Sequence, residues 1–581
     1  MKRLVVASLV CLLGPAACTP RIASTHGSIR TSPATAPSSG APPLEVAIRE
    51  ARDVGMMPAT QTLSFDLTLA DRDPSGLAAA MAGGSSLSAT EFANRYGPDP
   101  ARVASAMQVL AAAGLRAHWS PGDVLVRATG PASAIEQFLH ISIHRFIAVD
   151  GTPFYSALTT AAIPASINGT VIAITGLDDY QRDLTSAVPS SDVAGVTPQD
   201  MSTFYDITPL RNAGLDGAGE TVVFIEWGVP TNAVLNTWAQ KFTPGVPFNV
   251  QVHRDAADWG APLVSGDKQY SAVAGEAALD LEIVHGIAPR ANEVVYEFGN
   301  EGAIPDVVRA IAAASPGVIL SSSISEHECE LEQGAIADGA AEDQVDTAAA
   351  AQGMSIFWAS GDRGAYMCLN DYPDQDRNAN TEISVMPDAA SPGVTAVGGT
   401  TAFLAQNGGY FQESAWGEPI EQWGSGGGVS TAYPRPSWQQ APGISSSMTG
   451  RGLPDVAANA DIISGWDIIA PGQNAGDQAQ EGPVGGTSAA APFWAAVTAL
   501  IDEDLAHKSL PLVGFANPAL YLFAQSPSGL PAPAFHDVTL GSNLHFPAGQ
   551  GWDMATGLGT PDVGALANDF EWYERTHGSG S

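Results

Sequence analysis

Short apolar runs alternate with longer stretches of helical periodicity through residues 198–569. The strand-like runs lie at 221–225, 293–298, 317–322, 355–359 and 393–398, and the helical stretches lie between them at 233–241, 272–284, 306–314 and 344–352. Buried strands that alternate with helices are typical of βαβ units and a parallel sheet. We therefore expect an α/β domain with a central parallel sheet flanked by helices.

Residues 44–184 show a different pattern, in which short strands are mixed with helices. Strand-like runs at 62–69 and 123–128 are interspersed with helical stretches at 88–96, 101–113 and 132–139. This mixture predicts a separate α+β domain. The polar connector at 185–197 that follows is the kind of exposed segment that proteases cut easily, and we interpret it as a processing linker.

Both ends of the chain carry segments outside these domains. Residues 1–18 combine a basic start, an apolar run and small residues, which is typical of an export signal. Residues 19–43 predict a flexible leader rich in Ser, Thr, Ala and Pro, and residues 570–581 form a tail. We expect a secreted protein; a lipid anchor at Cys18 is the alternative, although Pro15 stands where lipoprotein signals usually carry Leu.

The charge of the chain excludes some partners. The formal net charge is −36, from 61 acidic and 25 basic residues, so nucleic acid and anionic membranes would be repelled. No later apolar run is long enough to span a bilayer. A chain with many carboxylates and few basic groups also loses most of its charge in acid, which avoids the positive charge that drives acid unfolding.

Two of the four cysteines remain once the export signal is set aside, because Cys11 and Cys18 lie in or beside it. Cys329 and Cys368 would form a disulfide in an oxidising compartment. Two buried free thiols are the alternative. No second cluster of Cys and His supports a zinc site.

Candidate chemistry begins with Ser488. Gly485 and Gly486 allow a tight turn before it, and the small residues after it can start a helix. A serine at a helix N-terminus can cap the helix through its side-chain oxygen. It can also be a nucleophile, because backbone N–H groups and the helix dipole there stabilise a developing oxyanion.

Glu276 and Asp280 lie four residues apart on a predicted helix and so share one face, whereas His285 lies on the opposite face. A solvated acidic face would explain the pair. Alternatively, one carboxylate acts as a base and the other orients it, with shared protons. Asp362 ends a small-residue turn after the strand at 355–359, which alone is weak support for a site.

Together these segments resemble the sedolisin family of serine-carboxyl peptidases, which have a subtilisin-like fold. The family carries Glu-x-x-x-Asp on a helix, then a Ser/Ala-Gly-Asp-x-Gly turn, then Gly-Thr-Ser with a following Pro; this chain has them in that order at Glu276/Asp280, 360–364 and 486–492. Further family-like blocks lie at 397–400, 413–416, 426–430, 436–439 and 452–458. Residues 44–184 resemble the activation domain that precedes kumamolisin-type and tripeptidyl-peptidase-type members.

The resemblance implies a role for each motif. Ser488 would attack the scissile carbonyl to form an acyl-enzyme, with Glu276 as general base and Asp280 orienting it and sharing a proton. Asp362, kept protonated, would donate a hydrogen bond to the oxyanion beside the N–H of Ser488. A carboxylic acid can donate a hydrogen bond only while it is neutral, and a glutamate base works at a lower pH than a histidine base. Both points imply an enzyme active in acid. Where the family usually has Ser-x-Ser-Trp-Gly, this chain has Ser-Ser-Ser-Ile-Ser at 321–325, a departure that affects the substrate-binding edge near Ser323.

The C-terminal region of the expected peptidase domain carries a calcium motif. Asp-Val followed by Gly-x-Gly-x-Asp matches the calcium loop of the same family, and calcium prefers oxygen ligands. The match implies one structural Ca²⁺, held by the side chains of Asp537 and Asp553 and the carbonyls of Val538, Gly549 and Gly551. Two ordinary turns are the alternative.

We therefore expect a self-processing zymogen that acts on polypeptide substrates as a monomeric endopeptidase. Its propeptide would serve as an intramolecular inhibitor and chaperone. Three alternatives remain: a tripeptidyl exopeptidase of the same family, an inactive calcium-stabilised binding protein, and a histidine-dependent subtilisin-like protease. The last would need His285, but the Asp-Ser/Thr-Gly and His-Gly-Thr-His blocks of such enzymes are missing from the sequence.

Overall fold

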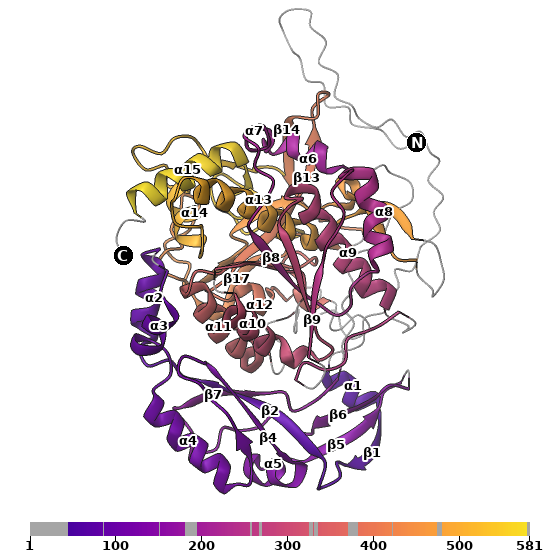
Figure 1. Ribbon diagram of the computed structural model, residues 1–581, viewed down its shortest axis with the longest axis vertical. Helices are drawn as coiled ribbons and strands as arrows, with labels where there is room; N and C mark the ends of the chain where they lie inside the picture. Colours follow the sequence, from indigo (N-terminus) through magenta and orange to yellow (C-terminus); the bar gives the residue numbers. More distant parts are fainter. Residues whose placement is uncertain are drawn as a thin grey trace, which may run out of the picture.

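The chain folds into two units that lie against each other (Figure 1). The computed structural model describes residues 44–84, 86–149, 151–180, 195–255, 258–265, 270–315, 317–324, 329, 335–369, 382–420, 422–472 and 479–577. The expected export signal with Cys18, the leader at 19–43 and residues 185–194 of the expected processing linker lie outside the described residues.

The smaller, N-terminal unit is built from two antiparallel sheets with helices packed on them. One sheet has the strand order β3-β4-β2-β7 and the other β1-β5-β6. The strands are β1 (Arg52–Met56), β2 (Thr62–Leu69), β3 (Arg116–Ala117), β4 (Leu125–Pro131), β5 (Ile143–Ile147), β6 (Pro153–Ala157) and β7 (Val171–Thr175). The helices are α1 (Leu44–Glu50), α2 (Pro74–Ala82), α3 (Ala89–Arg95), α4 (Pro100–Ala112) and α5 (Ala132–Leu139). The expected α+β mixture is confirmed.

The larger unit contains an eight-stranded sheet with the order β14-β13-β12-β11-β8-β10-β9, in which β19 also pairs with β13. Its strands run parallel except β14, which follows β13 through a hairpin and pairs with it antiparallel. The sheet is therefore mixed rather than purely parallel, and the α/β class is confirmed. The strands are β8 (Thr221–Glu226), β9 (Gln251–Arg254), β10 (Asn292–Glu297), β11 (Ile319–Ser322), β12 (Ser355–Ala359), β13 (Thr395–Leu404), β14 (Tyr410–Ala415) and β19 (Val456–Asn459).

Helices cover both faces of this sheet. In β8, Val222 and Phe224 join the core beneath one set of helices, whereas Val223 and Ile225 join the core beneath the other, as the twofold alternation of a strand requires. The first set contains α8 (Asn232–Phe242), α9 (Tyr270–Ile287) and α13 (Thr487–His507). The second contains α10 (Ile304–Ala314), α11 (Ala335–Ala351) and α12 (Pro387–Ala390).

Short elements complete the larger unit. The helices are α6 (Pro198–Phe204), α7 (Thr208–Asn212), α14 (Asn517–Ala524) and α15 (Val563–Thr576), with 3-10 turns at Glu301–Ala303, Met367–Leu369 and Ile462–Ser464. The short strands that pair two by two are β15 (Gly417–Glu418), β16 (Trp423–Gly424), β17 (Gly428–Pro434), β18 (Gly450–Leu453), β20 (Trp466–Ala470), β21 (Gln480–Val484), β22 (Phe535–His536) and β23 (Thr560–Pro561). Helix α15 buries Phe570 and Tyr573, so folded structure continues into the expected tail. None of the described helices combines the length and hydropathy that a bilayer span requires.

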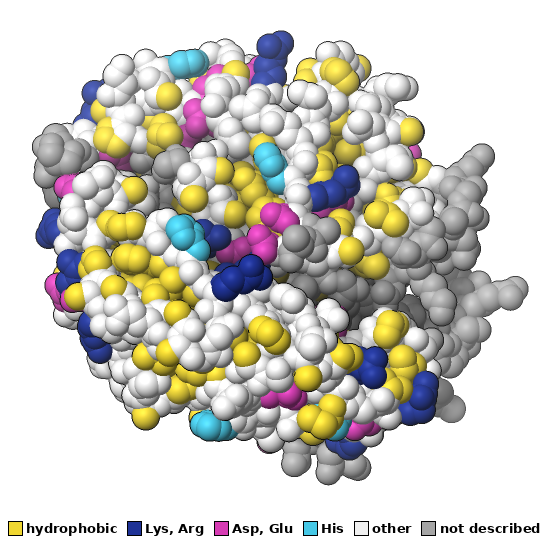
Figure 2. Space-filling view, turned by 60° about the horizontal axis from the view of Figure 1, so that its bottom comes forward, with side chains coloured by type: hydrophobic (Ala, Val, Ile, Leu, Met, Phe, Trp, Pro, Cys, Tyr) yellow, Lys and Arg dark blue, Asp and Glu magenta, His cyan; other side chains and the backbone are white. Residues whose placement is uncertain are grey.

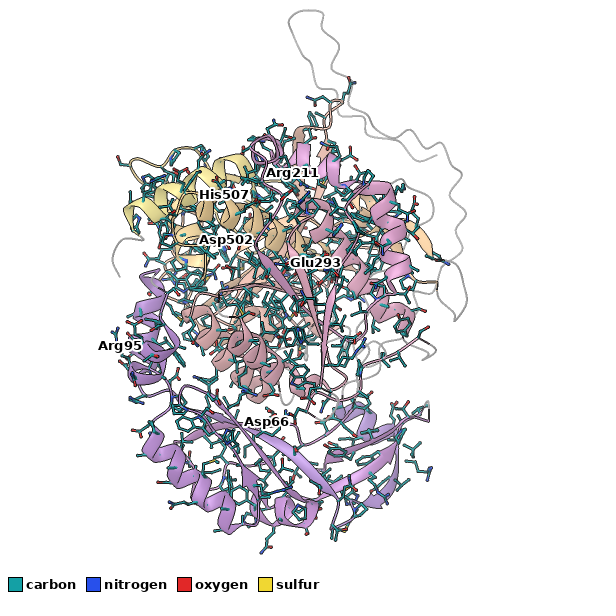
Figure 3. The ribbon with its side chains drawn as sticks, in the orientation of Figure 1. Asp66, Arg95, Arg211, Glu293, Asp502 and His507 are labelled. Atoms are coloured by element: carbon teal, nitrogen blue, oxygen red, sulfur yellow. A yellow bond between two sulfur atoms is a disulfide. The ribbon has the colours of Figure 1, made fainter. Side chains whose placement is uncertain are left out.

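The smaller unit docks on the face that carries α11. Side chains of α2 and α3, among them Leu77 and Phe92, enter the same apolar core as α10 and α11. Beside this core, Arg127 of the smaller unit pairs with Asp66 of its own unit at 2.7 Å and with Asp258 of the larger unit at 3.1 Å. Asp66 lies near the junction of the two units (Figure 3). Figure 2 shows acidic and basic side chains together near the centre of the face that it draws.

Candidate active site

Ser488 is the second residue of α13. Gly486, with φ +112°, is the residue that caps this helix, and no side chain caps it, so the interpretation of Ser488 as the cap is wrong. The positive φ favours glycine, and a Cβ at Gly486 would also come within 2.9 Å of Asp362 Oδ2. The turn therefore brings the start of α13 close to Asp362. Ser488 itself is 3% exposed.

Glu276 and Asp280 lie on α9, as expected, and on the same face of it. The helix is buried on nearly all sides, and both carboxyl groups are buried with it. The interpretation of the pair as a solvated acidic face is therefore wrong. Helix α9 packs against α13, which brings Glu276 next to Ser488.

The environment of Glu276 raises its pKa to about 7. Burial is the largest cause, the hydrogen bond with Ser488 acts against it, and the charge of Asp362 adds to the rise. The Oε1 atom of Glu276 makes no hydrogen bond within the described part of the chain. A buried carboxylate with one partner and a raised pKa is suited to accepting a proton from that partner.

Asp280 is held from the other side by Ser323, the residue directly after β11. Ser323 Oγ lies 2.9 Å from Asp280 Oδ1 and 3.0 Å from Oδ2. Burial and the charge of Glu276 raise the pKa of Asp280 well above its usual value, while the Ser323 hydrogen bond lowers it. The departure from the family motif near Ser323 therefore leaves a serine in contact with Asp280.

Asp362 approaches the start of α13 from the turn after β12. Its Oδ1 accepts hydrogen bonds from the Thr487 N–H at 2.7 Å and from Thr487 Oγ1 at 2.9 Å. Thr487 Oγ1 in turn accepts the N–H of Gly361 at 3.0 Å. The carboxyl group is thus fixed beside the first free N–H groups of the helix, which include that of Ser488.

The sequence did not single out Glu226, the last residue of β8. It is buried, and neither of its carboxyl oxygens has a hydrogen-bond partner among the described residues. Burial, together with the charges of Asp280, Glu276 and Glu297, raises its pKa well above the usual range. The only sequence signal was its place at the end of an apolar run, where parallel strands gather ligand-binding groups.

His285 lies away from these groups, as its position on the helix predicts. Its Nδ1 lies 3.2 Å from Glu293 Oε2, its Nε2 lies 2.9 Å from the Val246 carbonyl, and its ring stacks on Phe248. Burial acts to lower the pKa of His285, but the hydrogen bond and charge of Glu293 raise it overall. The structure therefore gives His285 a place in the core and none beside Ser488.

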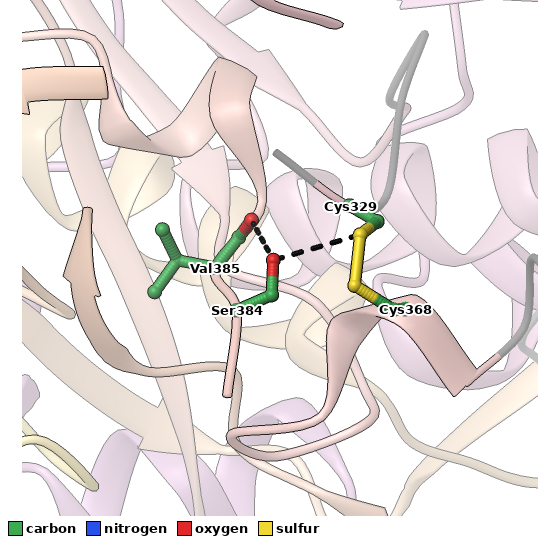
Figure 4. The surroundings of a disulfide bond; sticks show 4 residues. All are labelled: Cys329, Cys368, Ser384 and Val385. Atoms are coloured by element: carbon green, nitrogen blue, oxygen red, sulfur yellow. Dashed lines mark hydrogen bonds between the residues drawn. A yellow bond between two sulfur atoms is a disulfide. The ribbon is translucent and has the colours of Figure 1, made fainter. Parts of the chain in front are cut away.

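A disulfide joins two of the loops that carry this site. Cys329 and Cys368 are bonded, which confirms the expected pairing (Figure 4). Cys329 comes six positions after Ser323, and Cys368 comes six positions after Asp362. Ser384 Oγ lies 3.7 Å from the Cys329 sulfur. The bond therefore ties together the loops that follow β11 and β12.

The expected calcium ligands lie around one loop. Gly551 N–H donates to both carboxylate oxygens of Asp537 at 3.1 Å, and Gly549 N–H donates to Asp553 Oδ2 at 2.8 Å. Val538 is buried, and burial raises the pKa of Asp553. No group of three His, Cys, Asp or Glu side chains suited to a metal occurs in the described ranges. An ion here would therefore need backbone carbonyls and water in addition to the two carboxylates, a donor set that suits calcium.

Known proteins share both units of the chain. A family model described as "Pro-kumamolisin, activation domain" matches residues 49–180, and one described as "Subtilase family" matches residues 271–511. Kumamolisin from Bacillus sp. (strain MN-32) is 31% identical over 480 residues, which cover 77% of this chain and 78% of that protein. Tripeptidyl-peptidase 1 from Homo sapiens is 33% identical over 239 residues, which cover 38% of this chain and 37% of that protein.

The larger unit also resembles a solved structure, described as "Pseudomonas sedolisin (serine-carboxyl proteinase) complexed with two molecules of pseudo-iodotyrostatin". It is 28% identical in sequence, with a TM-score of 0.52, and the match covers 67% of this chain and all of that one. The similarity to kumamolisin extends through both units and over more than two thirds of each protein. The chain therefore belongs to the sedolisin family of serine-carboxyl peptidases, and a pro-kumamolisin activation domain precedes its peptidase domain.

Proposed function

We propose that this chain is a secreted, acid-active serine-carboxyl endopeptidase made as a self-processing zymogen. The observation that carries the proposal is that two buried side chains from different helices, Ser488 of α13 and Glu276 of α9, lie beside each other where these helices pack. Ser488 Oγ attacks the peptide carbonyl while Glu276 takes its proton, and Glu276 then returns the proton to the leaving amine. Water hydrolyses the acyl-enzyme by the same route in reverse.

The buried carboxyl groups around Glu276 support its role as the base. The pKa of Glu276 is raised to about 7 and those of Asp280 and Glu226 well above their usual values, with burial as the largest cause and neighbouring charges adding to each rise. The three groups therefore cannot all be ionised together. Glu276 is the one that lies beside Ser488, and a protonated Asp280 does not repel an ionised Glu276.

Asp362 is suited to stabilise the oxyanion. Its Oδ1 is an acceptor for two donors of Thr487, so a proton on this carboxyl group belongs on Oδ2, the oxygen nearest Gly486. A neutral Asp362 then acts with the Ser488 N–H as a pair of donors for the developing charge. Activity should rise with pH as Glu276 ionises and fall once Asp362 ionises, which gives a bell-shaped pH profile.

We also propose one structural calcium ion at the loop that contains Gly549 and Gly551. The side chains of Asp537 and Asp553 and the carbonyls of Val538, Gly549 and Gly551 would hold it, and the ion would neutralise the two carboxylates and stabilise the loop. Chelation with EDTA should lower the melting temperature of the Ser488→Ala protein, and added Ca²⁺ should restore it. An unchanged melting temperature in both conditions would contradict the assignment.

A mixed peptide library tests the proposed function most directly. Processed wild-type protein and Ser488→Ala protein are incubated with the library from pH 3 to pH 7, and the products are identified by mass. We expect cleavage at internal bonds by the wild type alone, strongest below neutral pH. Release of tripeptides from free N-termini would instead support the exopeptidase alternative. No cleavage at any pH would favour an inactive binding homologue.

A further inference from the structure

The carbonyl group of Ser488 lacks the donor that an α-helix normally supplies. In a helix, the carbonyl of residue i accepts the N–H of residue i+4, and here that residue is Pro492, which has no N–H. The hydroxyl of Ser323 lies 3.3 Å from this carbonyl oxygen. Ser323 comes from the loop after β11, on a different part of the sheet, and so replaces a missing bond of α13 from outside the helix.

The same hydroxyl also faces Asp280. Ser323 Oγ lies 2.9 Å and 3.0 Å from the two carboxyl oxygens. A serine hydroxyl carries one proton, so it can donate to Asp280 or to the Ser488 carbonyl, but not fully to both. An ionised Asp280 attracts that proton, whereas a protonated Asp280 can donate to Ser323 and leave its hydroxyl proton for Ser488.

We propose that Ser323 is a positioning residue that couples the protonation of Asp280 to the backbone of the nucleophile, by donating to the Ser488 carbonyl when Asp280 is protonated. This inference rests on the proposed function of Ser488 and Glu276. It explains why the site tolerates a proline four residues after the nucleophile. It also gives Asp280 a second task, besides its effect on Glu276.

The groups around Asp280 favour its protonated form in acid. Glu276 lies on the same helix, Glu226 approaches from β8, and Asp362 and Glu297 lie beyond these two. Burial and the charge of Glu276 raise the pKa of Asp280, and Ser323 is the group that opposes the rise. In acid, the Ser323 proton is therefore available to Ser488, and this link weakens as the pH rises.

The first test replaces Ser323 and measures kcat and KM from pH 3 to pH 8. In Ser323→Ala protein we expect kcat to fall about tenfold, which corresponds to about 1.4 kcal/mol of activation free energy, while KM changes little. The part of the kcat–pH profile that follows the ionisation of Asp280 should also shift. Ser323→Thr keeps the hydroxyl and should restore most of the activity. Ser321→Ala is the matched control, because Ser321 is a buried neighbour on β11 whose hydroxyl has no hydrogen-bond partner among the described residues.

A second variant tests the link to the helix itself. Pro492→Ala supplies an N–H four residues after Ser488, so the Ser488 carbonyl regains a helical donor. If Ser323 substitutes for that donor, the loss of kcat caused by Ser323→Ala should shrink from about tenfold to about threefold in the Pro492→Ala background. The two substitutions are then coupled, although they lie on different elements.

The outcomes separate this inference from the proposed function. An inactive wild-type protein would overturn both. An active wild type, an inactive Glu276→Ala variant and a Ser323→Ala variant with unchanged kcat and pH profile would overturn only the role of Ser323. A lowered melting temperature in Ser323→Ala protein, with equal losses in both Pro492 backgrounds and no shift in the pH profile, would assign Ser323 a purely structural role and would also overturn it.

Discussion

Asp502 should make the protein lose stability as the pH rises. This residue lies on α13 (Figure 3), fourteen positions after Ser488, and is 1% exposed. Its Oδ1 accepts the Val513 N–H at 2.8 Å. Burial, with added repulsion from Glu220 and Glu574, raises the pKa of Asp502 to about 8 against the effect of the Val513 hydrogen bond. The folded protein therefore favours the protonated form.

The size of the effect follows from the two pKa values of Asp502. An unfolded aspartate titrates near pH 3.9, and the folded pKa lies about four units higher. Because the folded pKa is the higher one, the stabilising contribution is fully present below about pH 4 and is lost as the pH rises through about 8. At about 1.4 kcal/mol per unit, the free energy of unfolding should decrease by about 5 kcal/mol across this range.

The Asp502→Asn variant removes this titration and keeps the acceptor for Val513. We would measure urea unfolding by tryptophan fluorescence from pH 4 to pH 8, in a Ser488→Ala background that prevents self-digestion. The variant should resemble its parent at pH 4 and become more stable than it at pH 7 to 8. Asp504→Asn is the matched control, because Asp504 lies two residues further along the helix and pairs with Lys508 at the surface, where such pairs contribute little.

The result that would refute this is a pair of parallel curves when the free energy of unfolding is plotted against pH for the two proteins. If the Asp502→Asn variant loses stability between pH 4 and pH 8 as steeply as its parent, Asp502 does not carry the pH dependence. If Asp504→Asn reduces the pH dependence of the unfolding free energy as strongly, a general effect of net charge, and not the burial of Asp502, would explain that dependence.

Other predictions concern the site and the disulfide. Glu276→Ala should abolish peptide cleavage, whereas His285→Ala should retain most of the activity despite lower stability; the reverse result would contradict the carboxylate assignment. Ser488→Ala zymogen should remain uncut between about 185 and 197 during acid incubation followed by gel electrophoresis, and conversion at the normal rate would exclude self-processing. Joint replacement of Cys329 and Cys368 by Ser should lower the free energy of unfolding by about 4 kcal/mol. The cysteines lie 39 positions apart, and this is the entropic contribution expected from closing a loop of that length. An unchanged urea midpoint would refute this.

Local sequence patterns were enough to predict most of the sheet and the helices next to it. The expected strand at 355–359 and helix at 132–139 coincide with β12 and α5. The strands β1, β5, β6 and β7 were missed. Each has only five residues; β1 and β7 pair with partners far along the chain, whereas β5 and β6 pair with each other. Short segments of this kind owe their conformation to pairing more than to their own sequence.

The candidate site could also be predicted only in part from local sequence patterns. The four-residue spacing of Glu276 and Asp280 already places them on one face of a helix, but it does not show whether that face is buried. Their burial depends on how α9 packs against α13, which brings together residues about 200 positions apart. The contacts of Glu226 and Ser323 depend on where strands β8 and β11 end beside each other, a property of the sheet and not of either segment.

The bond between Cys329 and Cys368 also fixes an order of events for making the protein. Thiol–disulfide exchange requires a thiolate, and the thiolate fraction of an ordinary thiol falls about a thousandfold between pH 7 and pH 4. If the protein works in acid, as we propose, the bond must form before the protein enters acid, and acid then protects it from exchange. In the folded protein Cys329 and Cys368 are 1% and 2% exposed, so burial adds to this protection from exchange.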